Sequence, residues 1–380
     1  MNILFVHPNL CKRAYNQIYA VNDYTDHNSY LLYGHPDTSA INLEKEIEKI
    51  CVEFKKKILP IKYPYSWKKN CQTIKKYCKK WDIDLIHSYS MPDDVTMAAI
   101  KSAQVPVIND VRDVATTFSK EVFSKMFSNN FFMQKILGWI SYTYAQSIEK
   151  KVMEKSDATV FSTKCMLEYA KKRYKLKEKN IVFLNYALEK ESCLLSKEKF
   201  SKIKGGMHVG FTGNINIDMA HRNFLPLFKK LADERIHVHM HVITRTNESL
   251  SACKKIAENN NFLHYYPPMP MSDILKELSK CDYGLLPFPT DKEKKYVDTI
   301  LPNKLFDYLI AGLPIASSNV QCAKRFLEEQ NVGFIYQDVE DLVTKLKQKT
   351  NTFYVDPKEF FIEKHIGKLD EFYKEIVDKN

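Results

Sequence analysis

Short apolar runs alternate with longer amphipathic segments along the first half of the chain. Runs with the length of buried strands are Ile3 to Val6, Leu85 to His87, Val105 to Ile108 and Ile181 to Leu184. The segments between them repeat apolar residues every three or four positions, as amphipathic helices do. This alternation predicts an α/β protein with a parallel sheet covered by helices on both faces.

The same alternation starts again after a segment rich in Lys, Glu and Ser that ends in two glycines. We interpret this segment, Leu188 to Gly206, as a linker. The pattern therefore predicts two Rossmann-like domains, at residues 1–190 and 205–350. A helix within residues 357–380 carries an apolar stripe and is expected to pack back on the first domain.

Three further segments of the first half are predicted to be helical, and each allows two interpretations. Residues 43–57 and 66–81 carry clusters of lysine, which suit either a solvated helix face or a helix on a membrane surface. Asn130 to Lys155 crowds aromatic residues near lysines, as in a buried helix or a lipid-interface anchor.

The most informative stretch runs from Cys281 to Ser318 and reads as a βαβ unit. A short apolar strand ends near Phe288, and a helix begins at Leu301-Pro302-Asn303-Lys304. Gly312 suits the C-cap of this helix, and a second apolar strand follows. The free backbone N–H groups at such a helix N-terminus can hold an anion, so this is a candidate phosphate site.

The segment from Pro302 to Ile315 resembles the nucleotide-sugar end of glycosyltransferases of the GT-B fold, particularly the retaining family 4. The matching string reads Pro-x-Lys, two apolar residues, an acid, Tyr, two apolar residues and Ala-Gly-x-Pro. The resemblance implies two Rossmann-like domains facing a cleft, with the nucleotide held by the second. It also implies that Asp307, where the family usually has Glu, binds the ribose hydroxyls of the donor.

Two positions depart from the family pattern. Thr299 stands where the family usually has a Glu that touches the donor sugar, and Arg112 stands where many members carry a His. These departures leave the donor sugar and the stereochemistry of transfer open.

Donor chemistry requires positive charge, because the diphosphate that leaves becomes more negative in the transition state. Without a metal, fixed cations and helix N-termini must supply that charge. Each cation alone is equally well explained as a surface residue, but together they lie where α/β sheets bind ligands. The donor-binding candidates are Gly213, Asn214, Arg222, Arg245, Tyr266, Thr299, Asn303, Lys304 and Asp307.

Acceptor chemistry is assigned to a polar cluster that follows the strand ending at Ile108. Asp110, Arg112 and Asp113 are the candidate catalytic residues, which would position an acceptor hydroxyl or steady the sugar. A structural cluster of ion pairs at a sheet edge is the alternative. We expect no metal and no cofactor besides the nucleotide-sugar donor, with UDP or GDP as its nucleotide.

The net charge indicates the kind of binding partner, and the cysteines indicate the cellular compartment. The chain has 380 residues and a formal charge of +11, of which residues 1–195 hold +9. A positive first half suits an anionic partner such as a lipid-linked acceptor or a membrane surface. Nucleic acid is disfavoured because the lysines are dispersed over several helices. Nine scattered cysteines and no signal peptide indicate a cytoplasmic protein, peripheral on the inner face of the membrane.

The prediction is thus a glycosyltransferase of the hexosyltransferase type that moves a sugar from a nucleotide-sugar to a hydroxyl of a glycan or lipid-linked glycan. Bacterial surface polysaccharide assembly is the expected setting. Two alternatives stay open: a GT-B nucleotide-sugar 2-epimerase, and a non-catalytic protein that binds nucleotide or a partner.

Overall fold

In a computed structural model, the chain divides into two compact units. Unit 1 comprises Met1–Leu184 and His365–Asn380, and unit 2 comprises Asn185–Lys364. The structure describes residues 1–36, 47–55, 66–90, 93–102, 104–124, 131–192, 195–196, 198–219, 222–244, 246–288, 294–348 and 353–378.

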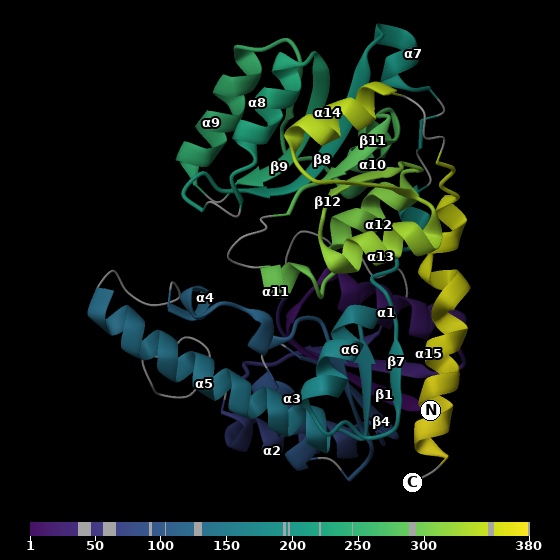
Figure 1. Ribbon diagram of the computed structural model, residues 1–380. Helices are drawn as coiled ribbons and strands as arrows, with labels where there is room; N and C mark the ends of the chain where they lie inside the picture. The colour runs from purple at the N-terminus through teal and green to yellow at the C-terminus, as the bar shows by residue number, and fades with distance from the viewer. Residues whose placement is uncertain are drawn as a thin grey trace. The chain divides into compact units, whose positions relative to one another are not determined.

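Unit 1 contains a parallel sheet of seven strands in the order β3-β2-β1-β4-β5-β6-β7 (Figure 1). The order reverses between β1 and β4, so the carboxyl ends of these two strands form a topological switch point. The strands are β1 Asn2–Leu10, β2 Asn28–Pro36, β3 Glu48–Cys51, β4 Leu85–Tyr89, β5 Val107–Val111, β6 Ala158–Phe161 and β7 Asn180–Val182.

Helices pack on the sheet of unit 1 through apolar faces. On one side, Leu4 and Ile86 of the sheet meet Ile74 of α2 and Ala98 of α3 in one buried cluster. The helices are α1 Lys12–Tyr24, α2 Trp67–Lys80, α3 Asp93–Ser102, η1 Ala115–Thr117, α4 Lys120–Ser124, α5 Phe131–Lys155, α6 Lys164–Arg173 and α15 Ile362–Val377. No helix among the described residues is long and apolar enough to cross a bilayer.

Unit 2 repeats this architecture with six parallel strands in the order β10-β9-β8-β11-β12-β13. Its switch point lies between β8 and β11. The strands are β8 Met207–Ile215, β9 Ile236–Thr244, β10 Leu263–Tyr266, β11 Tyr283–Leu286, β12 Ile315–Ser318 and β13 Gly333–Tyr336. Two parallel sheets with interleaved helices confirm the predicted α/β class with Rossmann-like halves.

The two faces of strands β8, β9 and β10 in unit 2 differ in chemistry. One face is apolar and packs Val209 and Met240 against Phe228 of α8 and Cys253 of α9. The other face carries histidines. The helices are η2 Glu189–Ser192, α7 Phe200–Lys204, α8 Leu225–Asp233, α9 Asn247–Glu258, α10 Met271–Ser279, α11 Lys294–Val297, α12 Asn303–Ile310, α13 Gln321–Gln330, α14 Val339–Gln348 and η4 Pro357–Phe360.

Two sequence-based expectations are wrong in detail. Residues 43–57 were expected to be helical, but Glu48–Cys51 forms the edge strand β3, paired in parallel with β2. Pairing with a neighbouring strand here overrides local helix preference. The expected linker from Leu188 to Gly206 belongs to unit 2, where the Phe200 ring stacks on His239 at 4.6 Å.

Candidate functional site

The cation site of unit 2 lies where β8 ends and α12 begins. Lys304, the second residue of α12, places its Nζ 4.6 Å from the Phe211 ring centroid and 5.5 Å from that of Phe224. Gly213 lies beside it with φ of 143°, and a Cβ there would sit 3.9 Å from Lys304 Cδ. The chain thus brings a half-buried ammonium group to the carboxyl end of the first strand of this sheet.

A second cation reaches the same place through a tight loop after β8. The Asn216 N–H donates to the Arg222 carbonyl at 3.2 Å, which folds the loop back on itself. Burial and the positive charge of Arg222 lower the pKa of Lys304 to about 7. Within the described part of the chain, no carboxylate lies within ion-pair distance of Lys304 Nζ. Two adjacent cations in this position favour binding of an anion with more than one charge.

Tyr308 fixes α12 against the sheet. Its buried hydroxyl accepts the Thr212 N–H at 3.0 Å and donates to the Leu285 carbonyl at 3.0 Å. A Cβ at Gly284 would come within 2.3 Å of the Tyr308 ring, so the close approach requires glycine. This tyrosine therefore links α12 to the ends of β8 and β11 and sets the position of Lys304.

The remaining predicted donor residues near α12 differ in exposure. Asn303 is exposed at the start of the helix, and Asp307 is buried one turn later. Thr299 is buried, and its hydroxyl donates to the Tyr296 carbonyl at 2.8 Å. Its neighbour Asp298 accepts the Gln321 N–H at 2.8 Å, and so caps α13.

The other predicted donor residues are Asn214, Tyr266 and Arg245, and they do not share one environment. Asn214 follows Gly213, and its buried Oδ1 has no hydrogen-bond partner among the described residues. The Tyr266 hydroxyl shares a hydrogen bond of 2.9 Å with His239 Nδ1, and its ring stacks on His241 at 4.2 Å, so Tyr266 joins the histidine-lined face. Arg245 lies outside the described residues.

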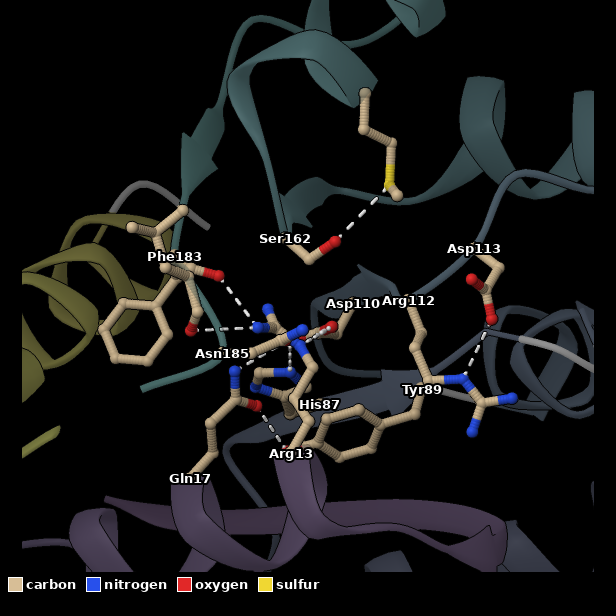
Figure 2. Close-up of polar contacts among 12 residues, drawn as sticks. Arg13, Gln17, His87, Tyr89, Asp110, Arg112, Asp113, Ser162, Phe183 and Asn185 are labelled. Atoms are coloured by element: carbon tan, nitrogen blue, oxygen red, sulfur yellow. Dashed lines mark hydrogen bonds and ion pairs between the residues drawn. The ribbon is translucent and has the colours of Figure 1, made fainter. Parts of the chain in front are cut away.

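In unit 1, Asp110 is the centre of a fully buried polar cluster (Figure 2). Its carboxylate accepts hydrogen bonds from Arg13 Nε at 2.9 Å and Nη2 at 3.0 Å. Gln17 and His87 each donate to it at 3.2 Å. Burial alone would raise the pKa of Asp110, but Arg13 and His87 outweigh it and lower the pKa to about 2. The carboxylate is therefore ionised, and its hydrogen-bonding capacity is used within the protein.

The same cluster also binds the segment that follows β7 and the C-terminal helix α15. Arg13 Nη1 donates to the carbonyls of Phe183 at 2.8 Å and Leu184 at 3.1 Å. Because the Asp110 carboxylate only accepts, His87 carries its proton on Nε2, and its Nδ1 accepts the Tyr373 hydroxyl at 2.6 Å. α1, β4, β5 and α15 thus meet at one network.

Arg112 and Asp113 form a separate pair after β5. Arg112 Nε lies 3.2 Å from Asp113 Oδ2, and both side chains are half-buried. Although burial opposes it, Asp113 and Cys11 raise the pKa of Arg112 above its ordinary value. Figure 2 shows this pair pointing away from the Arg13 side of the cluster. The three predicted catalytic residues therefore split, with Asp110 inward and the ion pair partly accessible.

Several important residues escaped the sequence analysis. Arg13 and Gln17 are spaced by four on α1 among apolar positions, a signal for a polar pair on a buried helix face. The pattern marks Phe211 only as part of a strand, and nothing local marks Phe224 as the second ring beneath Lys304. Tyr308 belongs to the string shared with GT-B enzymes, but the pattern does not indicate the contacts of its hydroxyl.

Part of unit 2 is similar to a known protein family. Residues 229–360 match the family model described as the glucosyltransferase 3-like C-terminal domain. Over 102 residues, which is 27% of this chain, it is 26% identical to glucosyltransferase 3 of Streptococcus parasanguinis. The aligned stretch spans 30% of the length of that curated relative.

Whole-chain similarity to solved structures is clear although identity is low. HepE of Anabaena in complex with UDP is 11% identical with a TM-score of 0.65, covering 99% of this chain and 100% of that one. Sucrose-phosphate synthase of Thermosynechococcus elongatus is 10% identical with a TM-score of 0.65, covering both chains fully. A putative UDP-N-acetylglucosamine 2-epimerase of Listeria monocytogenes is 9% identical with a TM-score of 0.61, covering 100% and 97%. The chain therefore has the GT-B fold, and its residues 229–360 match the model of the glucosyltransferase 3-like C-terminal domain.

Proposed function

We propose that this protein transfers a sugar, of the hexose type, from a nucleotide-sugar to a hydroxyl group of a glycan or lipid-linked glycan. The observation that carries the proposal is the pair of cations, Lys304 and Arg222, beside Gly213 at the carboxyl end of β8. A diphosphate supplies the matching charge, and its negative charge grows as the sugar leaves. Protonated Lys304 and Arg222 stabilise that charge, so the reaction is proposed to need no metal.

The donor is proposed to be a UDP-sugar, with UDP-glucose as the first to test. The solved HepE structures hold UDP and UDP-glucose, and the curated relative is a glucosyltransferase. Asp307 is assigned to the ribose hydroxyls, and Asn214 Oδ1 to a donor N–H or hydroxyl group. Tyr266, Thr299, Asn303 and Arg245 stay proposed donor contacts.

On the acceptor side, the structure supports different roles for the three candidates. Arg112 and Asp113 are accessible enough to touch an acceptor hydroxyl or the transferred sugar. Asp110 is fully buried and saturated with hydrogen bonds, so we assign it to positioning: it holds α1 and β4 beneath the ion pair. The net charge of +9 in unit 1 supports an anionic, lipid-linked acceptor in surface polysaccharide assembly, met at the inner face of the membrane.

The first experiment measures thermal stabilisation by UDP, GDP, ADP, CMP and dTDP, because a ligand at a hundred times its Kd adds about 2.7 kcal/mol to the folded state. We expect a shift with UDP that is lost in Lys304→Ala and kept in Lys255→Ala, an exposed lysine of α9. No shift with any diphosphate would refute the donor site.

Turnover then separates the possible reactions. UDP release from UDP-glucose should depend on an added glycan or lipid-linked acceptor and should continue in EDTA. UDP release or isomerisation of a UDP-sugar without any acceptor would instead identify an epimerase. Tight UDP binding with no turnover on a broad panel of sugars and acceptors would identify a nucleotide-binding protein.

A further inference from the structure

The outer face of α5 exposes three large apolar side chains in one patch. Trp139 is 59% exposed, Ile136 41% and Ile140 39%. Their spacing of three and four residues places them on one face of the helix. Clustered exposed apolar side chains mark interaction surfaces, whereas scattered single ones do not.

Exposed lysines flank this patch along α5, and among the side chains that the structure describes, residues 135–151 expose no acidic one. Lys135 is exposed next to Ile136, and Lys150 and Lys151 are exposed about three helical turns beyond Trp139 on the same side. Glu149 is the single acidic residue within residues 135–151; its side chain is buried and accepts a hydrogen bond from the Thr116 hydroxyl at 2.8 Å. The exposed surface of this stretch therefore combines an apolar patch beside Lys135 with two further lysines along the helix.

The inner face of α5 is firmly packed, so the outer face is held in place. Ile148 and Val152 pack against Met97 of α3, and Ala145 packs against Phe123 of α4. The Glu149 carboxylate also accepts the Ala115 N–H and the Tyr174 hydroxyl. Ile136, Trp139 and Ile140 on the opposite side of the helix stay exposed with the described parts of the chain in place. Figure 1 shows α5 running along the outside of this unit.

We propose that this face of α5, comprising Lys135, Ile136, Trp139, Ile140, Lys150 and Lys151, docks on an anionic lipid bilayer. Tryptophan and isoleucine suit the boundary between headgroups and acyl chains, and each lysine near an anionic surface adds attraction. Charge complementarity selects this occupant, because the exposed charged side chains of residues 135–151 are all lysines and the whole unit carries +9. The inference names the docking surface for the proposed membrane-linked role, but it does not depend on the donor site.

The test measures binding of the full chain, without nucleotide, to vesicles of phosphatidylcholine with or without phosphatidylglycerol. We expect binding only to the anionic vesicles, with a blue shift of tryptophan emission. Trp139 should report it, because Trp81 is buried and Trp67 is half-buried. Trp139→Ala should weaken binding about tenfold and abolish the shift, and Lys150→Glu with Lys151→Glu should weaken it about tenfold or more.

A matched control changes the same charge elsewhere. Lys254→Glu with Lys255→Glu, exposed on α9 of unit 2, should leave vesicle binding unchanged. Equal weakening by both lysine pairs, or unchanged binding in Trp139→Ala, would overturn the proposal. A concentration-dependent dimer that Trp139→Ala abolishes, with no vesicle binding, would instead assign this face to a second copy. The thermal response to UDP should persist in every variant, so a failure here stays distinct from a failure of the donor site.

Discussion

Replacing Tyr308 by Phe tests how α12 is held against the sheet of unit 2. The change removes one oxygen atom and leaves the ring packing intact. Two buried backbone groups then lose their partners, the Thr212 N–H and the Leu285 carbonyl. Thr212 is 8% exposed and Leu285 is fully buried, so water does not readily replace the hydroxyl.

Each buried group left without a partner costs about 1–3 kcal/mol, so we expect the loss of both partners to lower the free energy of unfolding by about 2–6 kcal/mol. For a unit of this size, 1 kcal/mol lowers Tm by roughly 2–4 °C, so the expected drop in Tm is between about 4 and 24 °C. Chemical and thermal denaturation would measure both values. The UDP response should also weaken in the folded variant, because the same hydroxyl sets the position of Lys304.

Tyr354→Phe is the matched control, since Tyr354 is 82% exposed. It should change stability by less than about 0.5 kcal/mol. If Tyr308→Phe were as stable as this control, the two hydrogen bonds would contribute nothing and the argument for a rigid α12 would fail.

Three further predictions concern packing, pH and the buried network. Gly284→Ala should destabilise unit 2 by about 1–3 kcal/mol or more, because the added Cβ would lie 2.3 Å from the buried Tyr308 ring. Gly367→Ala, with open space around it in α15, should be neutral or stabilising in the same denaturation assay. Burial lowers the pKa of His241 to about 4, so between pH 6.5 and about pH 4 the unfolded chain binds a proton that the folded chain does not. Within this window the group lowers the free energy of unfolding by up to about 1.4 kcal/mol for each unit by which the pH decreases. His241→Phe should remove that slope in the denaturation assay, and an unchanged profile would be the contrary result. Asp110→Asn leaves the buried Arg13 without its counter-charge and should lower the free energy of unfolding by about 3–5 kcal/mol. Asp113→Asn at the half-exposed pair should lower it by about 1 kcal/mol or less, and equal losses on denaturation would contradict the assignment.

The sequence predicted the features that local pattern controls. The βαβ unit around α12, the alternation of strands and helices and the position of Lys304 at a helix start all follow from spacing, caps and apolar runs. The general rule that ligands bind at the carboxyl ends of parallel strands then brought Lys304 and Gly213 to one place.

Features that depend on distant contacts could not be predicted. Arg13 and Asp110 lie 97 positions apart, so nothing local shows that the arginine saturates the carboxylate. β3 forms because β2 offers it backbone partners, although its residues suit a helix. The fold-back of the loop before Arg222 depends on backbone hydrogen bonds that no short motif marks.

The central claim is that Lys304 binds the donor diphosphate, and calorimetric titration with UDP in buffers of different ionisation enthalpy tests it most directly. Lys304 has a pKa of about 7 without ligand, so at pH 8 it is mostly neutral and must take up a proton as the diphosphate binds. We predict uptake of about one proton by the wild-type protein. Lys304→Ala should show no uptake and a Kd raised at least about tenfold. UDP binding of equal affinity and equal proton uptake in both proteins would contradict the account.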